Sequence, residues 1–226
     1  TGETPDLFAV RMRLPERVLF LVDGAQGAGH LPLKMRAAGI DFLALAGHKG
    51  LHAIQGAGAL LFSERVSPDP VLFGGTGSES FNLDMPAFYP DRLESGTLSY
   101  PAISSLFEGA LIVQARRSEG ARKLISVTGA VAEAVSSMDG FTSYSAANAC
   151  GISAFAHEKI PSEELAGILS ERFGIAVRGG LHCAPKMHEA LGTKEGLVRA
   201  SLSEYSTRAE AELFLRAVRE ISASVR

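Results

Sequence analysis

The feature that most constrains the fold is a continuous apolar run, Val18–Val22, that ends at Asp23. Because the run is apolar at every position rather than at alternate ones, it predicts a strand buried on both faces, as in a parallel sheet. A second strand is expected at 42–46, after a turn closed by Gly39, and a third at 57–62. In open α/β sheets, ligands bind at the carboxyl ends of the strands. The sequence therefore predicts a binding site beside Asp23 and the end of the second strand.

The remainder of the chain predicts a long loop, a connecting helix and a smaller second domain. Residues 71–100 are rich in Gly, Ser, Pro and Asp and have no helical period, whereas a helical period begins at Pro101. After Gly120, helices and strands alternate. The expected elements are a helix to about 137, strands at 140–144 and 151–156, a helix at 162–173, a short strand through Val177, a strand at 197–202 and a helix from the Thr207-x-x-Glu210 capping box to about 222. The chain is thus expected to be α/β, with domains at 1–117 and 118–226, the second being α+β.

Composition excludes several classes of protein. The 226 residues are 46% hydrophobic and 21% charged, with a net charge of −3, which is typical of a globular protein rather than a disordered or fibrous one. No basic stripe or tail is present that would attract nucleic acid or an anionic membrane. Apolar runs are too short to span a bilayer, and two cysteines are too few for a disulfide scaffold. We therefore expect a cytoplasmic protein without nucleic-acid or membrane partners.

Lys49 follows the second expected strand directly, in the string Gly47-His48-Lys49. A lysine at this position is partly removed from water, which makes its neutral amine available to condense with an aldehyde. Asp23 would face the same crevice, and pyridoxal phosphate requires a carboxylate beside its ring nitrogen. Gln26 could bond the ring's 3-hydroxyl. The alternatives are a surface lysine at a strand end and an Asp-Gly tight turn.

Cys183 lies in a glycine-rich loop beside His182 and close in sequence to Arg178, surroundings typical of a reactive thiolate. Cys150 has no such neighbours and is interpreted as a small core residue. Arg199 stands in an apolar strand, where an unpaired guanidinium would be costly. Its partner is either a substrate carboxylate or an internal carboxylate.

Two further patterns have some features of ligand sites. The loop Gly74-Gly75-Thr76-Gly77-Ser78 lets backbone N–H groups approach a phosphate, although a flexible turn has the same composition. It lacks the Gly-Lys-Ser/Thr ending of a nucleotide P-loop. His48 and His52 are four residues apart, but no third ligand is placed with them, so no metal site is predicted.

Taken together, these motifs resemble the class V aminotransferase-fold enzymes, specifically the cysteine desulfurases and selenocysteine lyases. The resemblance covers nearly the whole chain and is carried, in order, by segments 22–26, 47–49, 74–78, 92–97, 178–185 and 198–201. It implies the C-terminal part of the large domain of a fold type I pyridoxal-phosphate (PLP) dependent transferase, with a mostly parallel sheet, followed by the small domain.

The resemblance also implies roles for individual residues. Lys49 would hold pyridoxal 5'-phosphate, Asp23 would pair with its ring nitrogen, Gln26 would touch the 3-oxygen and His48 the phosphate. Thr97 would reach the phosphate of the neighbouring subunit's cofactor, which implies a homodimer.

The implied reaction is removal of sulfur from cysteine. The Cys183 thiolate would attack the sulfur of the cofactor-bound substrate and become a persulfide, leaving alanine. Arg199 would hold the substrate carboxylate, with Arg178 as a second substrate-binding residue, and an acceptor protein would take the sulfur. Two alternatives stay open: another class V reaction, such as transamination or selenocysteine cleavage, and a non-catalytic fragment.

The sequence departs from the family pattern in three places, one of which is the stretch 51–56, where a turn of the Leu-Gly-Pro-Gln-Gly type is more usual. Ala46 stands where many relatives carry a phosphate-binding serine or threonine. The chain also begins just upstream of the strand that ends at Asp23, whereas the family's large domain has more sheet before that point. A sheet without those strands exposes apolar surface, so the 226-residue chain alone is expected to be poorly soluble or to bind pyridoxal phosphate weakly.

Overall fold

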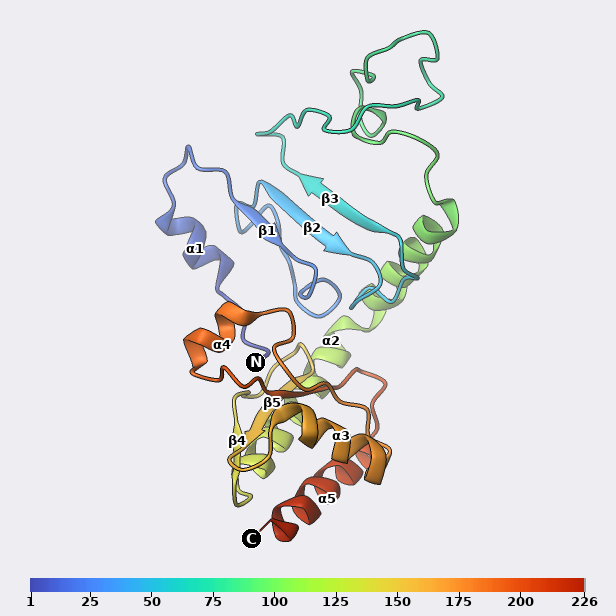
Figure 1. Cartoon of the computed structure of the whole chain (residues 1–226). Coiled ribbons are helices and arrows are strands. Elements are labelled where there is room, and N and C mark those ends of the chain that lie inside the picture. Colours follow the sequence, from blue (N-terminus) through green and yellow to red (C-terminus); the bar gives the residue numbers. More distant parts are fainter. Residues whose placement is uncertain (226) are drawn as a thin grey trace. The chain divides into compact units, whose positions relative to one another are not determined.

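The structure is a computed structural model that describes residues 1–225, and the chain divides into two compact units (Figure 1). One unit comprises residues 6–115, and the other begins at Arg116 and also includes residues 1–5. The division lies two residues before the expected boundary after 117 and falls within a single helix. The roles assigned to the two expected domains stay predictions.

The first unit contains one three-stranded sheet. Its elements are α1 (Leu7–Arg13), β1 (Leu21–Asp23), β2 (Phe42–Ala46), β3 (Gly58–Phe62), a 3₁₀ helix (Asp91–Leu93) and the first part of α2 (Tyr100–Ser136). The strand order is β1-β2-β3 (Figure 1); β1 runs parallel to β2, and β3 runs antiparallel to it. The sheet is therefore mixed where a mostly parallel one was expected. The link from β2 to β3 is too short for the crossover that a parallel pair needs.

The core of this sheet is small. Val22, Ile40 and Leu43 are buried together, with partly buried side chains of α1 and of the segment before β2 around them. The prediction that the run 18–22 is buried on both faces was wrong, because Leu19 and Leu21 are 52% and 61% exposed. An apolar run indicates that burying its side chains would be favourable, but it does not show whether other elements of the chain cover both faces of the strand.

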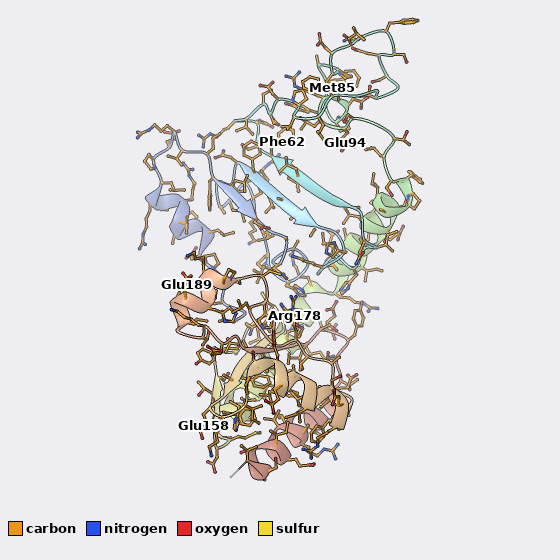
Figure 2. All side chains as sticks on the ribbon, in the orientation of Figure 1. Phe62, Met85, Glu94, Glu158, Arg178 and Glu189 are labelled. Carbon is orange, nitrogen blue, oxygen red and sulfur yellow. The ribbon has the colours of Figure 1, made fainter. Side chains whose placement is uncertain are left out.

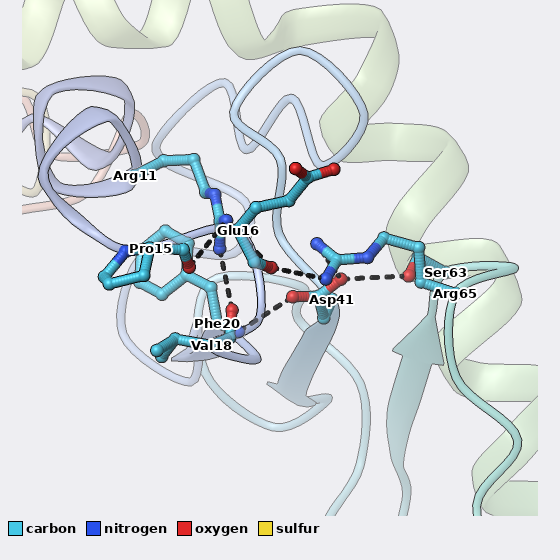
Figure 3. Close-up of polar contacts among 8 residues, drawn as sticks. All are labelled: Arg11, Pro15, Glu16, Val18, Phe20, Asp41, Ser63 and Arg65. Carbon is cyan, nitrogen blue, oxygen red and sulfur yellow. Dashed lines mark hydrogen bonds and ion pairs between the residues drawn. The ribbon is translucent and has the colours of Figure 1, made fainter.

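The buried carboxylate of Asp41 accepts polar contacts from residues next to the ends of all three strands (Figure 3). Asp41 is 1% exposed, and its Oδ2 accepts a hydrogen bond from the Phe20 backbone N–H at 2.8 Å. Its Oδ1 accepts from the Ser63 hydroxyl at 3.3 Å and lies 3.4 Å from the Arg65 guanidinium. The Arg65 guanidinium also donates to the Glu16 carbonyl at 2.7 Å. No sequence motif indicated a role for Asp41.

The expected long loop follows β3 (Figure 2) and contains no helix or strand apart from the short 3₁₀ helix. Met85 is buried within it, whereas Val71, Leu72, Phe81 and Leu83 are exposed. The loop thus buries Met85 but presents several large apolar side chains to solvent.

The second unit is an α+β domain built on an antiparallel sheet. Its elements after α2 are β4 (Phe141–Ser143), β5 (Ile152–His157), α3 (Ser162–Phe173), α4 (Pro185–Leu191), β6 (Val198–Ser201) and α5 (Arg208–Ser224), with strand order β4-β5-β6. Phe155 and Val198 on the sheet pack with Leu165 of α3, Val218 of α5 and Val135 of α2. The predicted capping box is confirmed, because Thr207 and Glu210 bond each other's backbone N–H groups.

Two local expectations were wrong, and one short helix was missed. Gly120 does not separate two helices, because one glycine costs a helix interior only about 1 kcal/mol and α2 continues through it. The strand expected through Val177 is a single bridge between Arg178 and Arg199. The short helix α4 was not predicted. Within residues 1–225, no helix is long and apolar enough to cross a membrane.

His157 makes the stability of this unit depend on pH. It is buried at the end of β5, its Nδ1 accepts from the Lys159 backbone N–H at 3.1 Å, and its ring packs edge-on against Phe141. Burial lowers the pKa of His157 below its ordinary value of 6.5; Lys159 acts in the same direction and Glu158 opposes it. Between about pH 6.5 and the lower folded-state pKa of His157, the unfolded chain therefore binds a proton that the folded chain does not.

We expect the free energy of unfolding to be highest above pH 6.5 and to fall as the pH drops through the folded-state pKa of His157. Urea unfolding of wild type and His157→Asn between pH 5 and 7.5 measures this dependence. The variant should show a shallower slope, since it lacks one of the titrating groups. An equal slope in both proteins would contradict the assignment.

Candidate active site

Four of the predicted cofactor residues lie at one edge of the β1-β2 sheet. Asp23 ends β1 and pairs with Ala44 of β2, so the two parallel strands finish at the same edge. His48 and Lys49 lie in the turn that follows β2, and Gln26 lies in the turn that follows β1. Lys49 is half-buried, whereas the other three side chains are exposed.

The two turns are in direct backbone contact. A side chain at Gly29 would overlap the Gly50 carbonyl, and a side chain at Gly50 would overlap the Ala28 carbonyl. Only residues without a Cβ allow this approach, which Gly29 makes with a φ of 90°. The contact brings the segment that carries Gln26 against the segment that carries Lys49.

The carboxylate of Asp23 also shapes its own turn. Its Oδ1 accepts a hydrogen bond from the Ala25 backbone N–H at 2.9 Å, and the Gly24 N–H donates to the Ala44 carbonyl at 2.8 Å. The tight turn considered from sequence is therefore present. A carboxylate has further acceptor sites, and the side chain is exposed, so this turn leaves Asp23 able to accept a second donor.

Thr97 belongs to a different part of the first unit. The Gly96 backbone N–H donates to the Gly75 carbonyl at 2.8 Å, which joins the segment before α2 to the glycine-rich loop. Thr97 and Gly75 are exposed. Thr97 therefore lies with the glycine-rich loop rather than with the strand-edge residues.

In the second unit, two arginines stand directly opposite each other. Arg178 and Arg199 form an antiparallel bridge, with N–H to carbonyl distances of 3.1 and 2.7 Å. Directly paired residues project from the same face, and like charges in that position destabilise a sheet. Moreover, the Nε of Arg199 is buried without a hydrogen-bond partner among residues 1–225. Both features are those of a site for an anion.

Cys183 lies beside this arginine pair. Its side chain is exposed, and Nη2 of Arg178 donates to its Sγ at 3.9 Å. Arg178, labelled in Figure 2, therefore belongs both to the pair and to the surroundings of the thiol. Cys150 is a free, half-buried cysteine, and burial raises the pKa of its thiol. The predicted residues thus form one group at the β1-β2 edge of the first unit and one in the second unit, while Thr97 lies apart from both.

A pocket of about 280 Å³ lies beside the start of the Cys183 loop. It is formed by the start of α3, by Gly180 and Leu181, and by Lys194 and Glu195 before β6. None of the predicted site residues lines it, although Gly180 and Leu181 belong to the motif at 178–185. Among the described residues 1–225, no cluster of three or more His, Cys, Asp or Glu side chains is placed to hold a metal ion.

Known proteins resemble this chain over nearly all of its length. The sequence profile of the Aminotransferase class-V family matches residues 3–214. A probable cysteine desulfurase of Methanothermobacter thermautotrophicus is 36% identical over 218 residues, which are 90% of this chain and 53% of that protein. The cysteine desulfurase CsdA of Escherichia coli is 30% identical over 227 residues, or 96% of this chain and 55% of that protein.

Solved structures of cysteine desulfurases also resemble this chain. The apo structure of a cysteine desulfurase from Thermococcus onnurineus has a TM-score of 0.83 and 28% identity, covering 93% of this chain and 54% of that chain. The E. coli CsdA structure with an S-sulfonic acid also has a TM-score of 0.83, at 27% identity, covering all of this chain and 57% of that one. These likenesses confirm the expected α/β fold class. The chain spans about half the length of the curated relatives it matches. It belongs to the class-V aminotransferase family.

Proposed function

We propose that this chain carries the cofactor lysine and the sulfur-accepting cysteine of a pyridoxal-phosphate-dependent cysteine desulfurase, which converts L-cysteine to L-alanine and leaves a persulfide on Cys183. The observation that carries the proposal is an exposed thiol in contact with Arg178, which itself stands opposite Arg199 with its unpartnered Nε. That arrangement combines a nucleophile with a site for a carboxylate. The names of the relatives support the same reaction.

The residues at the edge of β1 and β2 fit pyridoxal phosphate by the chemistry of their groups. An amine, a carboxylate, an amide and an imidazole lie on two turns in backbone contact, and the amine of Lys49 is half-buried. Lys49 would hold the cofactor, with Asp23 at its ring nitrogen, Gln26 at its 3-oxygen and His48 at its phosphate. When bound, the cofactor supplies an electron sink for the substrate's α-carbon.

The chain's own residues would then bind the substrate, move its protons and accept its sulfur. Arg199 binds and orients the α-carboxylate of cysteine, and Lys49 moves protons at the α- and β-carbons. The Cys183 thiolate attacks the substrate sulfur; an S–S bond forms, the carbon–sulfur bond breaks, and its electron pair stays with the carbon. Protonation of that carbon completes alanine, and the transferred sulfur remains on Cys183.

The proposal includes a homodimer, a cytoplasmic location and a protein acceptor for the sulfur. The dimer is supported by the exposure of Thr97 and of the apolar side chains Phe73, Phe81 and Leu83 in the long loop. The cytoplasmic location is supported by two cysteines that are both free. The acceptor is supported by the exposure of Cys183, which leaves its sulfur within reach of a second protein.

The function is tested by incubating the holoprotein with L-cysteine under anaerobic conditions, without an added reductant. We expect one alanine for each persulfide, and we expect peptide mass spectrometry to place the extra sulfur on Cys183 and not on Cys150. Selenocysteine as a second substrate measures the preference between the two amino acids. Formation of a keto acid in place of alanine would instead identify a transaminase.

A further inference from the structure

Cys183 and the residue before it have a backbone conformation that few residues other than glycine adopt. The φ angles of His182 and Cys183 are 53° and 59°, both in the left-handed region. In the described part of the chain, only one other non-glycine residue, His52, has a positive φ. Such conformations persist only where the surrounding contacts enforce them. A contact of this loop must therefore hold the pair in place.

Two contacts act on the pair directly: the Ala184 backbone N–H donates to the Leu181 carbonyl at 2.9 Å, which closes a turn around the pair, and the His182 side chain bonds to a neighbouring segment. Before the pair, the Gly180 carbonyl accepts from the Leu197 N–H at 3.1 Å, and the Gly180 N–H donates to the Ser162 hydroxyl at 3.2 Å. Within the pair, Nε2 of His182 lies 2.9 Å from the Leu197 carbonyl oxygen. A carbonyl oxygen only accepts, so Nε2 carries a hydrogen. The imidazole therefore clamps the loop to the residue that precedes β6.

The other ring nitrogen of His182 has unusual surroundings. Nδ1 is buried and has no hydrogen-bond partner within residues 1–225. A proton on it would place a third positive charge near Arg178 and Arg199, with the His188 ring 5.9 Å away between centroids. Burial is the main cause that lowers the pKa of His182; the two arginines and His188 act in the same direction, and the bond to Leu197 opposes them. At neutral pH the ring is therefore neutral.

We propose that neutral His182 is a positioning residue for Cys183: its Nε2–H bond to the Leu197 carbonyl fixes the left-handed pair and so holds the sulfur beside Arg178. The inference rests on the proposed function in one respect: it takes the Cys183 sulfur as the atom that accepts the sulfur of the substrate. A protonated imidazole would add a third positive charge that the two arginines repel, whereas a neutral donor anchors the loop without changing the charge around them.

The tautomer is tested first, on the full chain labelled with ¹⁵N-histidine. We expect the His182 ring to carry its hydrogen on Nε2 and to titrate below the ordinary value of 6.5. A hydrogen on Nδ1 alone would overturn the proposal, because Nε2 could not then donate to Leu197. His182→Gln identifies the signal by its loss.

Two variants test the clamp itself. The amide of His182→Gln reaches as far as Nε2 and donates without a charge, whereas His182→Ala cannot donate. In the alanine variant we expect hydrogen exchange at the Leu197 amide to become at least about fivefold faster, while the glutamine variant stays within about twofold of wild type. The amides of α5 serve as the control for global unfolding.

In the holoprotein, we expect His182→Ala to lower kcat at least about fivefold with KM for cysteine unchanged, because Arg199 still binds the carboxylate. His182→Gln should restore most of kcat. Unchanged exchange and kcat in the alanine variant, or equal losses in both variants, would overturn the proposal. If wild type does not release alanine from cysteine, the proposed function fails, while the tautomer and the exchange rates still decide the role of His182.

Discussion

Replacing Cys183 with alanine is expected to abolish sulfur release from cysteine, with a loss of at least about 10³-fold in kcat. The thiolate is the only group in the proposed reaction that receives the substrate sulfur, and none of the neighbouring side chains, Arg178, His182 or Arg199, has a thiol that could hold it as a persulfide. Alanine formation from L-cysteine by the holoprotein measures the effect. Binding of cofactor should be unchanged, because the residues assigned to it lie in the other unit.

Cys150→Ala is the matched control, since it removes the other free thiol of the chain. That variant should keep activity near the wild-type value, apart from a small loss of stability, because Cys150 is half-buried and burial raises the pKa of its thiol. Full desulfuration by Cys183→Ala would exclude the proposed mechanism. It would leave a class V reaction in which this cysteine is not essential.

Replacing Asp41 with alanine is expected to lower the free energy of unfolding of the first unit by about 3 kcal/mol. The change leaves the Phe20 backbone N–H without its acceptor and removes the partner of Ser63 and Arg65, at a position that is 1% exposed. The cost comes mainly from the hydrogen bonds to a charged acceptor, since Arg65 itself remains partly in water. Urea unfolding followed by circular dichroism measures it.

Asp69→Ala provides the comparison for Asp41. Asp69 also pairs with an arginine, at 2.6 Å from Arg92, but its side chain is 85% exposed. Exposed pairs contribute at most about 1 kcal/mol, so this variant should unfold close to the wild-type midpoint. Equal destabilisation by the two substitutions would show that Asp41 has no special role in joining the strand ends.

Sequence reasoning succeeded where a local rule decides the structure. The helix at 162–173 and the capping box at Thr207 follow from periodicity and from side-chain bonds within a single turn. The strand 42–46 has the bounds that the sequence predicts, because apolar residues and flanking turns define it. The grouping of Asp23 with His48 and Lys49 at one edge follows from the parallel pairing of β1 and β2.

The parts that could not be predicted depend on contacts between distant residues. Asp41 has no motif, and its importance arises only when Phe20, Ser63 and Arg65 meet around it. Likewise, the bond between His182 and the Leu197 carbonyl joins residues 15 positions apart, and no periodicity reports it. The exposure of Leu19 depends on which elements cover the sheet, and a short apolar run does not reveal those elements.

The central claim is that Lys49 holds the cofactor, and its most direct test is chemical. The protein is saturated with pyridoxal phosphate, reduced with borohydride, digested and analysed by peptide mass spectrometry. We predict a pyridoxyl group on Lys49 and none on Lys34. Lys34 is the control, because it is an exposed lysine of the same unit. Label distributed over both lysines, or absent from Lys49, would contradict the assignment and with it the proposed sulfur chemistry.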